Sequence, residues 1–85
     1  MTRDECLRAI SAAFGNAPTW AAAGTWLCRV DGSPKREVTL SPAFVNRNVM
    51  GAGLSAAELT TLLRGLDTQR WTIRKPDNVR TISLE

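Results

Sequence analysis

The side chains of this 85-residue chain that are best suited to binding chemistry are cations near its C-terminal end. They are Arg64, Arg70, Arg74, Lys75 and Arg80. Asp67 and Asp77 are the only acidic residues in the same stretch, so its net charge is +3, which equals the net charge of the whole chain. Arginine and lysine contact phosphate oxygens without reading bases. The cluster therefore predicts binding to a nucleic-acid backbone, with DNA and RNA both left open.

A second polar group, Asn46-Arg47-Asn48, lies in the middle of the chain. If these side chains bind nucleic acid, Arg47 joins the candidate contact residues. The plainer interpretation makes the three residues the solvent side and the C-terminal cap of a short helix. Asparagine suits helix ends and loops, so the plainer interpretation is favoured.

Three tryptophans, Trp20, Trp26 and Trp71, could stack on bases. The chain has only two phenylalanines and no tyrosine, so we expect Trp26 and Trp71 to anchor the core. Trp20 lies in an alanine-rich segment and is the best candidate for an exposed tryptophan. An exposed tryptophan is typical of a protein-binding hot spot.

Enzyme chemistry has little support in the sequence. Histidine is absent, so the usual general base near neutral pH and the Ser–His and Cys–His pairs are missing. We expect no enzymatic activity and no cofactor. Gly51-Ala52-Gly53 resembles a phosphate loop only in being glycine-rich before a helix, because a Walker lysine is lacking. A turn with positive φ at its glycines is the favoured interpretation.

The two cysteines, Cys6 and Cys28, form no CxxC pattern. Without histidine, a structural zinc would need an unusual set of ligands, so we expect no metal. Two buried free thiols are the favoured interpretation, and a single disulfide is the alternative.

Composition fits one small domain over residues 1–85, with 44% hydrophobic and 22% charged residues. No apolar run reaches the ~20 residues of a membrane span, and the charged start does not resemble a signal peptide. We therefore expect a cytoplasmic protein that does not enter a membrane. The closing Leu84-Glu85 fits either a native end or a cloning remnant.

Two segments carry the signature of a helix start. Thr2 with Glu5, and Ser55 with Glu58, each fit a capping box. Apolar residues at helical spacing follow both, which predicts helices ending near Gly15 and Leu66. A shorter helix is predicted over 42–50, because Ser41 can cap it and Pro42 suits its first turn.

Alternating apolar residues predict four strands in two hairpins. The first pairs 25–30 with 36–40, and the second pairs 70–75 with 79–84 around a Pro-Asp-Asn turn. In the second, we expect Trp71 and Ile73 to face inward opposite Ile82 and Leu84. One helical turn is predicted over 20–23.

These elements predict an α+β fold, in which two main helices pack on a small antiparallel sheet made of two hairpins. A winged helix-turn-helix is the alternative, although its recognition helix would begin with Ser55-Ala56-Ala57-Glu58, which suits base reading poorly. We expect a non-enzymatic binding or regulatory module that binds nucleic acid through its basic C-terminal hairpin. The alternative is a protein-interaction module, such as a small adaptor or inhibitor, that uses the Trp20 loop. The oligomeric state stays open.

Overall fold

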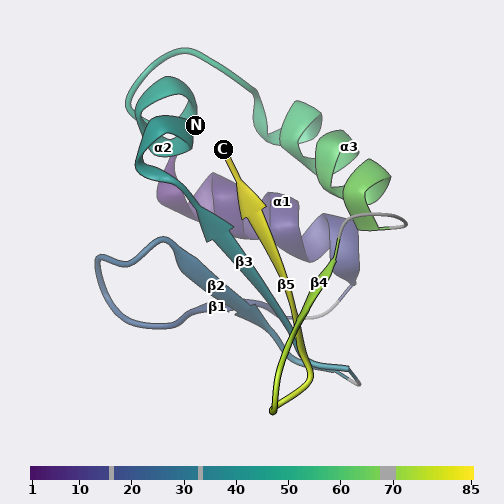
Figure 1. Cartoon of the computed structure of the whole chain (residues 1–85). Helices are drawn as coiled ribbons and strands as arrows, with labels where there is room; N and C mark the ends of the chain where they lie inside the picture. The colour runs from purple at the N-terminus through teal and green to yellow at the C-terminus, as the bar shows by residue number, and fades with distance from the viewer. Residues whose placement is uncertain (16, 33, 68–70) are drawn as a thin grey trace.

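A computed structural model describes residues 1–15, 17–32, 34–67 and 71–85 (Figure 1). The helices are α1 (Arg3–Phe14), α2 (Pro42–Asn48) and α3 (Ala56–Asp67). The strands are β1 (Thr19–Trp20), β2 (Leu27–Val30), β3 (Arg36–Leu40), β4 (Thr72–Arg74) and β5 (Val79–Leu84). The α+β class predicted from the sequence is confirmed.

The strands form one five-stranded mixed sheet in the order β1-β2-β3-β5-β4. Both predicted hairpins are present, as β2 with β3 and as β4 with β5. They join side by side through β3 and β5, which run parallel, with Val38 opposite Ile82 and Leu40 opposite Leu84. The prediction of a purely antiparallel sheet is therefore wrong.

The parallel pair follows from the long connection between β3 and β5. Parallel neighbours need a crossover of a dozen or more residues, and this crossover contains α2, α3 and β4. The second hairpin thus extends the sheet beside β3 and does not stand apart as a wing. The winged-helix alternative does not describe this arrangement.

The long helices begin as their sequences predict. The Thr2 hydroxyl accepts from the Glu5 amide at 3.1 Å, and the Glu5 carboxylate accepts from the Thr2 amide at 3.0 Å. Ser55 and Glu58 make the same reciprocal pair before α3. Gly15 ends α1 in the left-handed region with φ of 76°, which glycine adopts without steric penalty. Both capping boxes are confirmed.

The short helix α2 is joined to α3 by a tight turn. Ser41 caps α2 by accepting from the Phe44 amide. The buried Asn48 side chain donates to the Phe44 carbonyl and accepts from the Leu54 amide at 2.7 Å. A Cβ on Gly53 would lie 2.0 Å from Asn48 Oδ1. Glycine is needed here for close approach, and not for the positive φ that the sequence suggested, because Gly51 and Gly53 do not have it.

The core lies between the helices and one face of the sheet. In Figure 1, α1 runs behind β3 and β5, so the opposite face of the sheet is turned toward the viewer. Alternate residues of the three central strands enter the core with both long helices. The fully buried members of the core are Cys6, Ile10, Cys28, Val30, Val38, Leu59 and Leu63.

Two local predictions are wrong. Residues 19–20 form β1 and not part of a helical turn, because Thr19 pairs with Arg29 and Trp20 with Cys28. Sheet pairing thus overrides the helical preference of the alanines that follow. Ile73 lies on the same side of the sheet as the core but is 51% exposed, because it is in the edge strand β4, opposite Arg80 and not opposite Ile82 or Leu84. Ile82 and Leu84 are buried as predicted.

Both cysteines are buried and unbonded to each other, as the favoured interpretation predicted. Within the described ranges, no helix has the length and apolar character needed to cross a membrane.

Candidate functional site

None of the helices among the described residues covers the face of the sheet that is turned toward the viewer in Figure 1, and we call it the open face. Its exposed residues are Thr19, Arg29, Thr39, Thr72, Arg74 and Ser83. On β1, β2, β3 and β5 they alternate with residues that pack in or against the core, because successive side chains of a strand point to opposite faces. On β4 all three residues are exposed. The exposed side chains of the open face are thus hydroxyl and guanidinium groups, and the less exposed Leu27, Glu37 and Val79 share the face with them.

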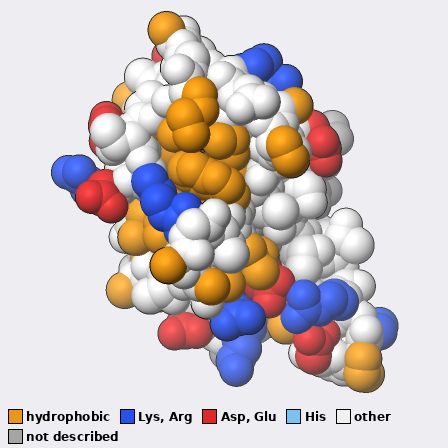
Figure 2. All heavy atoms as spheres, turned by 90° about the vertical axis from the view of Figure 1, so that its left-hand side faces the viewer, with side chains coloured by type: hydrophobic (Ala, Val, Ile, Leu, Met, Phe, Trp, Pro, Cys, Tyr) orange, Lys and Arg blue, Asp and Glu red, His pale blue; other side chains and the backbone are white. Residues whose placement is uncertain are grey.

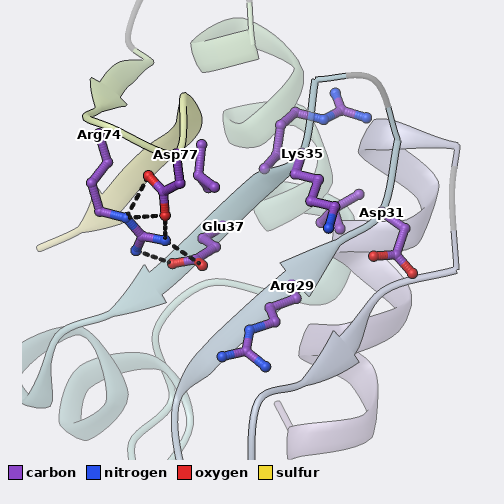
Figure 3. Close-up of a pocket in the computed structure, with 9 residues that line it drawn as sticks. Arg29, Asp31, Lys35, Glu37, Arg74 and Asp77 are labelled. Atoms are coloured by element: carbon purple, nitrogen blue, oxygen red, sulfur yellow. Dashed lines mark hydrogen bonds and ion pairs between the residues drawn. The ribbon is translucent and has the colours of Figure 1, made fainter.

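A cavity of about 590 Å³ lies at one end of the sheet, where the β2–β3 and β4–β5 hairpins meet (Figure 3). Its cationic lining residues are Arg29, Lys35, Arg36 and Arg74. Its carboxylates are Asp31, Glu37 and Asp77. The two hairpins contribute charges of both signs, and the parallel pairing of β3 with β5 brings those charges together.

Arg74 is held by two carboxylates. Its two terminal nitrogens donate to the Glu37 oxygens at 3.0 and 3.2 Å, while Nε and one terminal nitrogen donate to Asp77, the shortest contact being 2.7 Å. The Asp77 and Glu37 bonds raise the pKa of Arg74, and the Arg74 bond lowers the pKa of Asp77. Because its donors are engaged, Arg74 is a poor candidate for binding an external phosphate.

Arg29 and Lys35 are placed differently. Both are exposed and line the cavity, and neither side chain makes a hydrogen bond or ion pair with another described residue. In Figure 3 the Arg29 guanidinium extends away from the Arg74–Glu37–Asp77 group. Among the described cations that line the cavity, these two are therefore the ones that an external anion can reach without displacing a carboxylate or an aromatic contact.

Arg36 and Arg80 lie side by side in register on β3 and β5. The Arg36 guanidinium stacks 4.9 Å from the centre of the Phe14 ring and 6.0 Å from that of Trp71. Arg80 is exposed. Both side chains lie on the same side of the sheet as the core residues Val38 and Ile82, and not on the open face.

Only part of the predicted basic cluster comes together. Arg74, Lys75 and Arg80 share the β4–β5 hairpin, where Lys75 donates to Asn78 at 2.8 Å. Arg64 lies on α3 and donates to the Ala12 carbonyl at 3.3 Å, on the helical side of the molecule. Arg70 lies outside the described residues.

The polar triplet of α2 divides between structural and exposed roles. Asn48 is buried and holds the turn before α3, in agreement with the plainer interpretation. Asn46 is exposed, and Arg47 donates to the carbonyl of Glu85. Figure 1 shows α2 beside the C-terminus, at the opposite end of the sheet from the β4–β5 turn. Arg47 is thus separated from the other predicted contacts.

Trp20 is half-buried rather than fully exposed. Its ring meets Trp26 edge-on at 5.4 Å, and Arg3 lies 4.3 Å from its centre. The buried indole N–H of Trp20 has no acceptor among the described residues. Figure 2 views the left-hand side of Figure 1 and shows hydrophobic side chains in the upper middle, with charges of both signs crowded toward the lower end.

The cavity also contains residues that the sequence did not single out as functional. Arg29 shows only as the polar member of an alternating strand, and Lys35 only as part of a turn. Glu37, 9% exposed, is one of the two carboxylates that pair with Arg74. Each of these signals exists in the sequence, but their meeting depends on which strands are neighbours.

The described residues contain no group of three His, Cys, Asp or Glu side chains placed to hold a metal. Burial raises the pKa of Cys28 to about 11 and raises that of Cys6. Both thiols therefore stay protonated at neutral pH, which disfavours them as nucleophiles. Comparison of the chain with protein-family models, curated proteins and solved structures found no match.

Proposed function

We propose that this domain is a non-enzymatic binding module that holds nucleic acid at the hairpin end of its open face. The observation that supports the proposal is the position of Arg29 and Lys35, two exposed cations beside the cavity with no partner among the described residues. Phosphate oxygens are the acceptors that such donors commonly bind in nucleic-acid complexes.

The neighbouring side chains suit the same ligand. Thr39 and Ser83 are exposed and lie opposite each other on β3 and β5. Hydroxyl groups of this kind contribute many of the sugar and phosphate contacts in protein–DNA interfaces. A backbone that crosses the open face would meet cations at the hairpin end and hydroxyls farther along.

The carboxylates limit the strength of binding. Glu37 and Asp77 neutralise Arg74, and the whole chain carries only +3. Few phosphates can therefore be neutralised at once. We expect weak binding that is strongest at low salt, because each neutralised phosphate adds to the salt dependence.

The test is the affinity of the Arg29→Ala, Lys35→Ala double variant for short nucleic acids at several salt concentrations. We expect weaker binding. The slope of the logarithm of the binding constant against the logarithm of salt concentration should become less negative by about 0.9 for each duplex phosphate that the variant no longer neutralises. The control Arg8→Ala removes one cation from an exposed position of α1, away from the open face, and its effect is compared with half of that of the double variant, which removes two. Unchanged affinity and slope in the double variant would contradict the proposal.

A second candidate function is protein interaction through Trp20. The observation that favours it is the half-buried group of Arg3, Trp20 and Trp26, in which the cation stacks on both rings. Tryptophan and arginine are enriched among residues that dominate binding energy. A partner that covered this group would complete the burial of both rings.

A photo-crosslinking amino acid at Ala22 tests the second candidate, since Ala22 is exposed and follows β1 closely. We expect a crosslinked partner that disappears when Trp20→Ala is added. The same probe at Ala57, exposed on α3, is the control. Equal crosslinking at both positions would rule out a dedicated surface around Trp20.

A further inference from the structure

We infer that the nucleic acid held by the open face is a duplex, bound through its phosphates with no dependence on base sequence. This inference rests on the proposed function and narrows its ligand. It follows from where the fold places the aromatic side chains of the chain.

None of the aromatic side chains lies on the open face. The chain contains three tryptophans, two phenylalanines and no tyrosine. Trp20 pairs with Cys28 and shares its face of the sheet, which is the core face. Trp26 precedes Cys28 by two residues, and its ring packs against Trp20.

The remaining aromatic residues also belong to the helical side. Trp71 packs on Phe14 of α1 with 5.4 Å between ring centres, and both rings contact the core. Phe44 is buried in α2. Every aromatic ring of the chain is thus used in packing on the side of the sheet that the helices cover.

A sheet that binds single strands normally offers rings on which unpaired bases stack. The exposed side chains of the open face are threonine, serine and arginine instead. Arginine planes can also stack on bases, but the Arg74 guanidinium is fixed by Glu37 and Asp77. Among the described open-face residues, only Arg29 keeps an unengaged guanidinium, and one plane is not a platform for successive bases.

A duplex needs no such platform. Its bases are already stacked, and its outer surface presents phosphates at twice the linear density of one strand. Hydroxyls and cations can contact these phosphates. The described open-face residues include no asparagine or glutamine to pair with adenine, and Arg29 is the single unengaged guanidinium among them that could meet a guanine edge. The face therefore suits backbone binding and not sequence recognition.

The experiment compares a duplex with each of its separated strands, at equal length and at two salt concentrations, by fluorescence anisotropy. DNA and RNA versions are both measured, together with a second duplex of unrelated sequence. We expect the DNA or the RNA duplex, whichever binds more tightly, to have an affinity at least about tenfold higher than that of either of its separated strands. The affinities of two duplexes of unrelated sequence should differ by less than about threefold.

Thr39→Tyr sharpens the comparison, because it places a ring at an exposed position of β3 that favours β-branched and aromatic residues. We expect it to raise affinity for the single strand more than for the duplex. Thr61→Tyr, on an exposed position of α3, is the control. A parent protein that binds a single strand as tightly as the duplex would overturn the inference but leave the proposed function standing. Absence of binding to any of these ligands at low salt would overturn both.

Discussion

The guanidinium of Arg74 on β4 binds the carboxylate of Glu37 on β3 in a two-point contact, at 3.0 and 3.2 Å. The two strands are not neighbours, because β5 lies between them. The contact therefore crosses a strand on the open face and links the edge of the sheet to its centre. Asp77 in the hairpin turn binds the same guanidinium, so one side chain fixes the three segments relative to one another.

Arg74→Ala is expected to loosen the β4–β5 hairpin and lower the free energy of unfolding. It would leave the nearly buried Glu37 carboxylate without its partner, and an unpaired buried charge is destabilising. Amide hydrogen exchange should speed up in β4 and the adjoining half of β5, with little change in α1. Urea unfolding gives the accompanying change in stability.

Lys75→Ala is the matched control for this prediction, because Lys75 is the next cation in the same turn and bonds only the exposed Asn78 among the described residues. We expect it to leave exchange in β4 nearly unchanged. Equal effects of the two substitutions would show that the Arg74–Glu37 contact does not hold the hairpin.

Acid should destabilise the fold through Asp77, Glu5 and Glu58. Hydrogen bonds lower the pKa of each below its ordinary value, from Arg74 for Asp77, from Thr2 for Glu5 and from Ser55 for Glu58. A lowered pKa stabilises the fold at pH above the ordinary values, 3.8 for Asp and 4.5 for Glu. That stabilisation is lost as pH falls through the lowered values.

Thermal unfolding between about pH 7 and 2 measures this effect. We expect a nearly constant Tm down to about pH 5 and a fall below about pH 4. Asp77→Asn should start from a lower Tm at neutral pH and fall less steeply in acid. If the Tm of Asp77→Asn fell as steeply in acid as that of the parent protein, a contribution from Asp77 to the acid sensitivity would be excluded.

Leu59→Ala is expected to lower the free energy of unfolding by about 2–5 kcal/mol, since it opens a cavity in the core. Leu59 is 0% exposed, whereas Leu62 on the same helix is 40% exposed. Leu62→Ala should therefore change stability by less than about 1 kcal/mol. Chemical unfolding of both variants checks the prediction. Similar losses of stability in the two variants would mean that α3 does not bury the side of the helix that carries Leu59.

Two glycine substitutions should have opposite signs. Gly53→Ala places a Cβ against Asn48 Oδ1 and the Arg47 carbonyl, at 2.0 and 2.6 Å, so we expect a loss of about 1–3 kcal/mol. Gly65→Ala meets no atom within 4 Å and lies inside α3. Alanine is favoured over glycine in a helix, so we expect a gain of about 0.5–1 kcal/mol. A stable Gly53→Ala variant with an unshifted Asn48 would contradict the close approach.

The features that sequence predicts well in this chain are those encoded by neighbouring residues. Both capping boxes, the Ser41-Pro42 start and the two hairpins depend on side chains within a few positions of one another, and all of them form. The buried stripe of α3 follows in the same way, because Leu59 and Leu63 are one helical turn apart.

The features that sequence does not predict depend on strand order. The capping patterns and strand alternation would be the same whether β3 paired with β5 or with β4, so the cavity could not be seen in advance. Arg74 has the same local sequence whether it is free for phosphate or bonded to Glu37. Its partner is 37 positions away and becomes a neighbour only through the parallel pair.

The most direct test of the proposed binding surface is a titration of the labelled protein with a short duplex at low salt, followed by amide and side-chain NMR signals. We predict the largest shifts at Arg29, Lys35, Thr39 and Ser83, with smaller ones in α1 and α3. The shifts should weaken as salt is raised. Shifts confined to the helices, or none at low salt, would contradict the assignment of nucleic-acid binding to the open face.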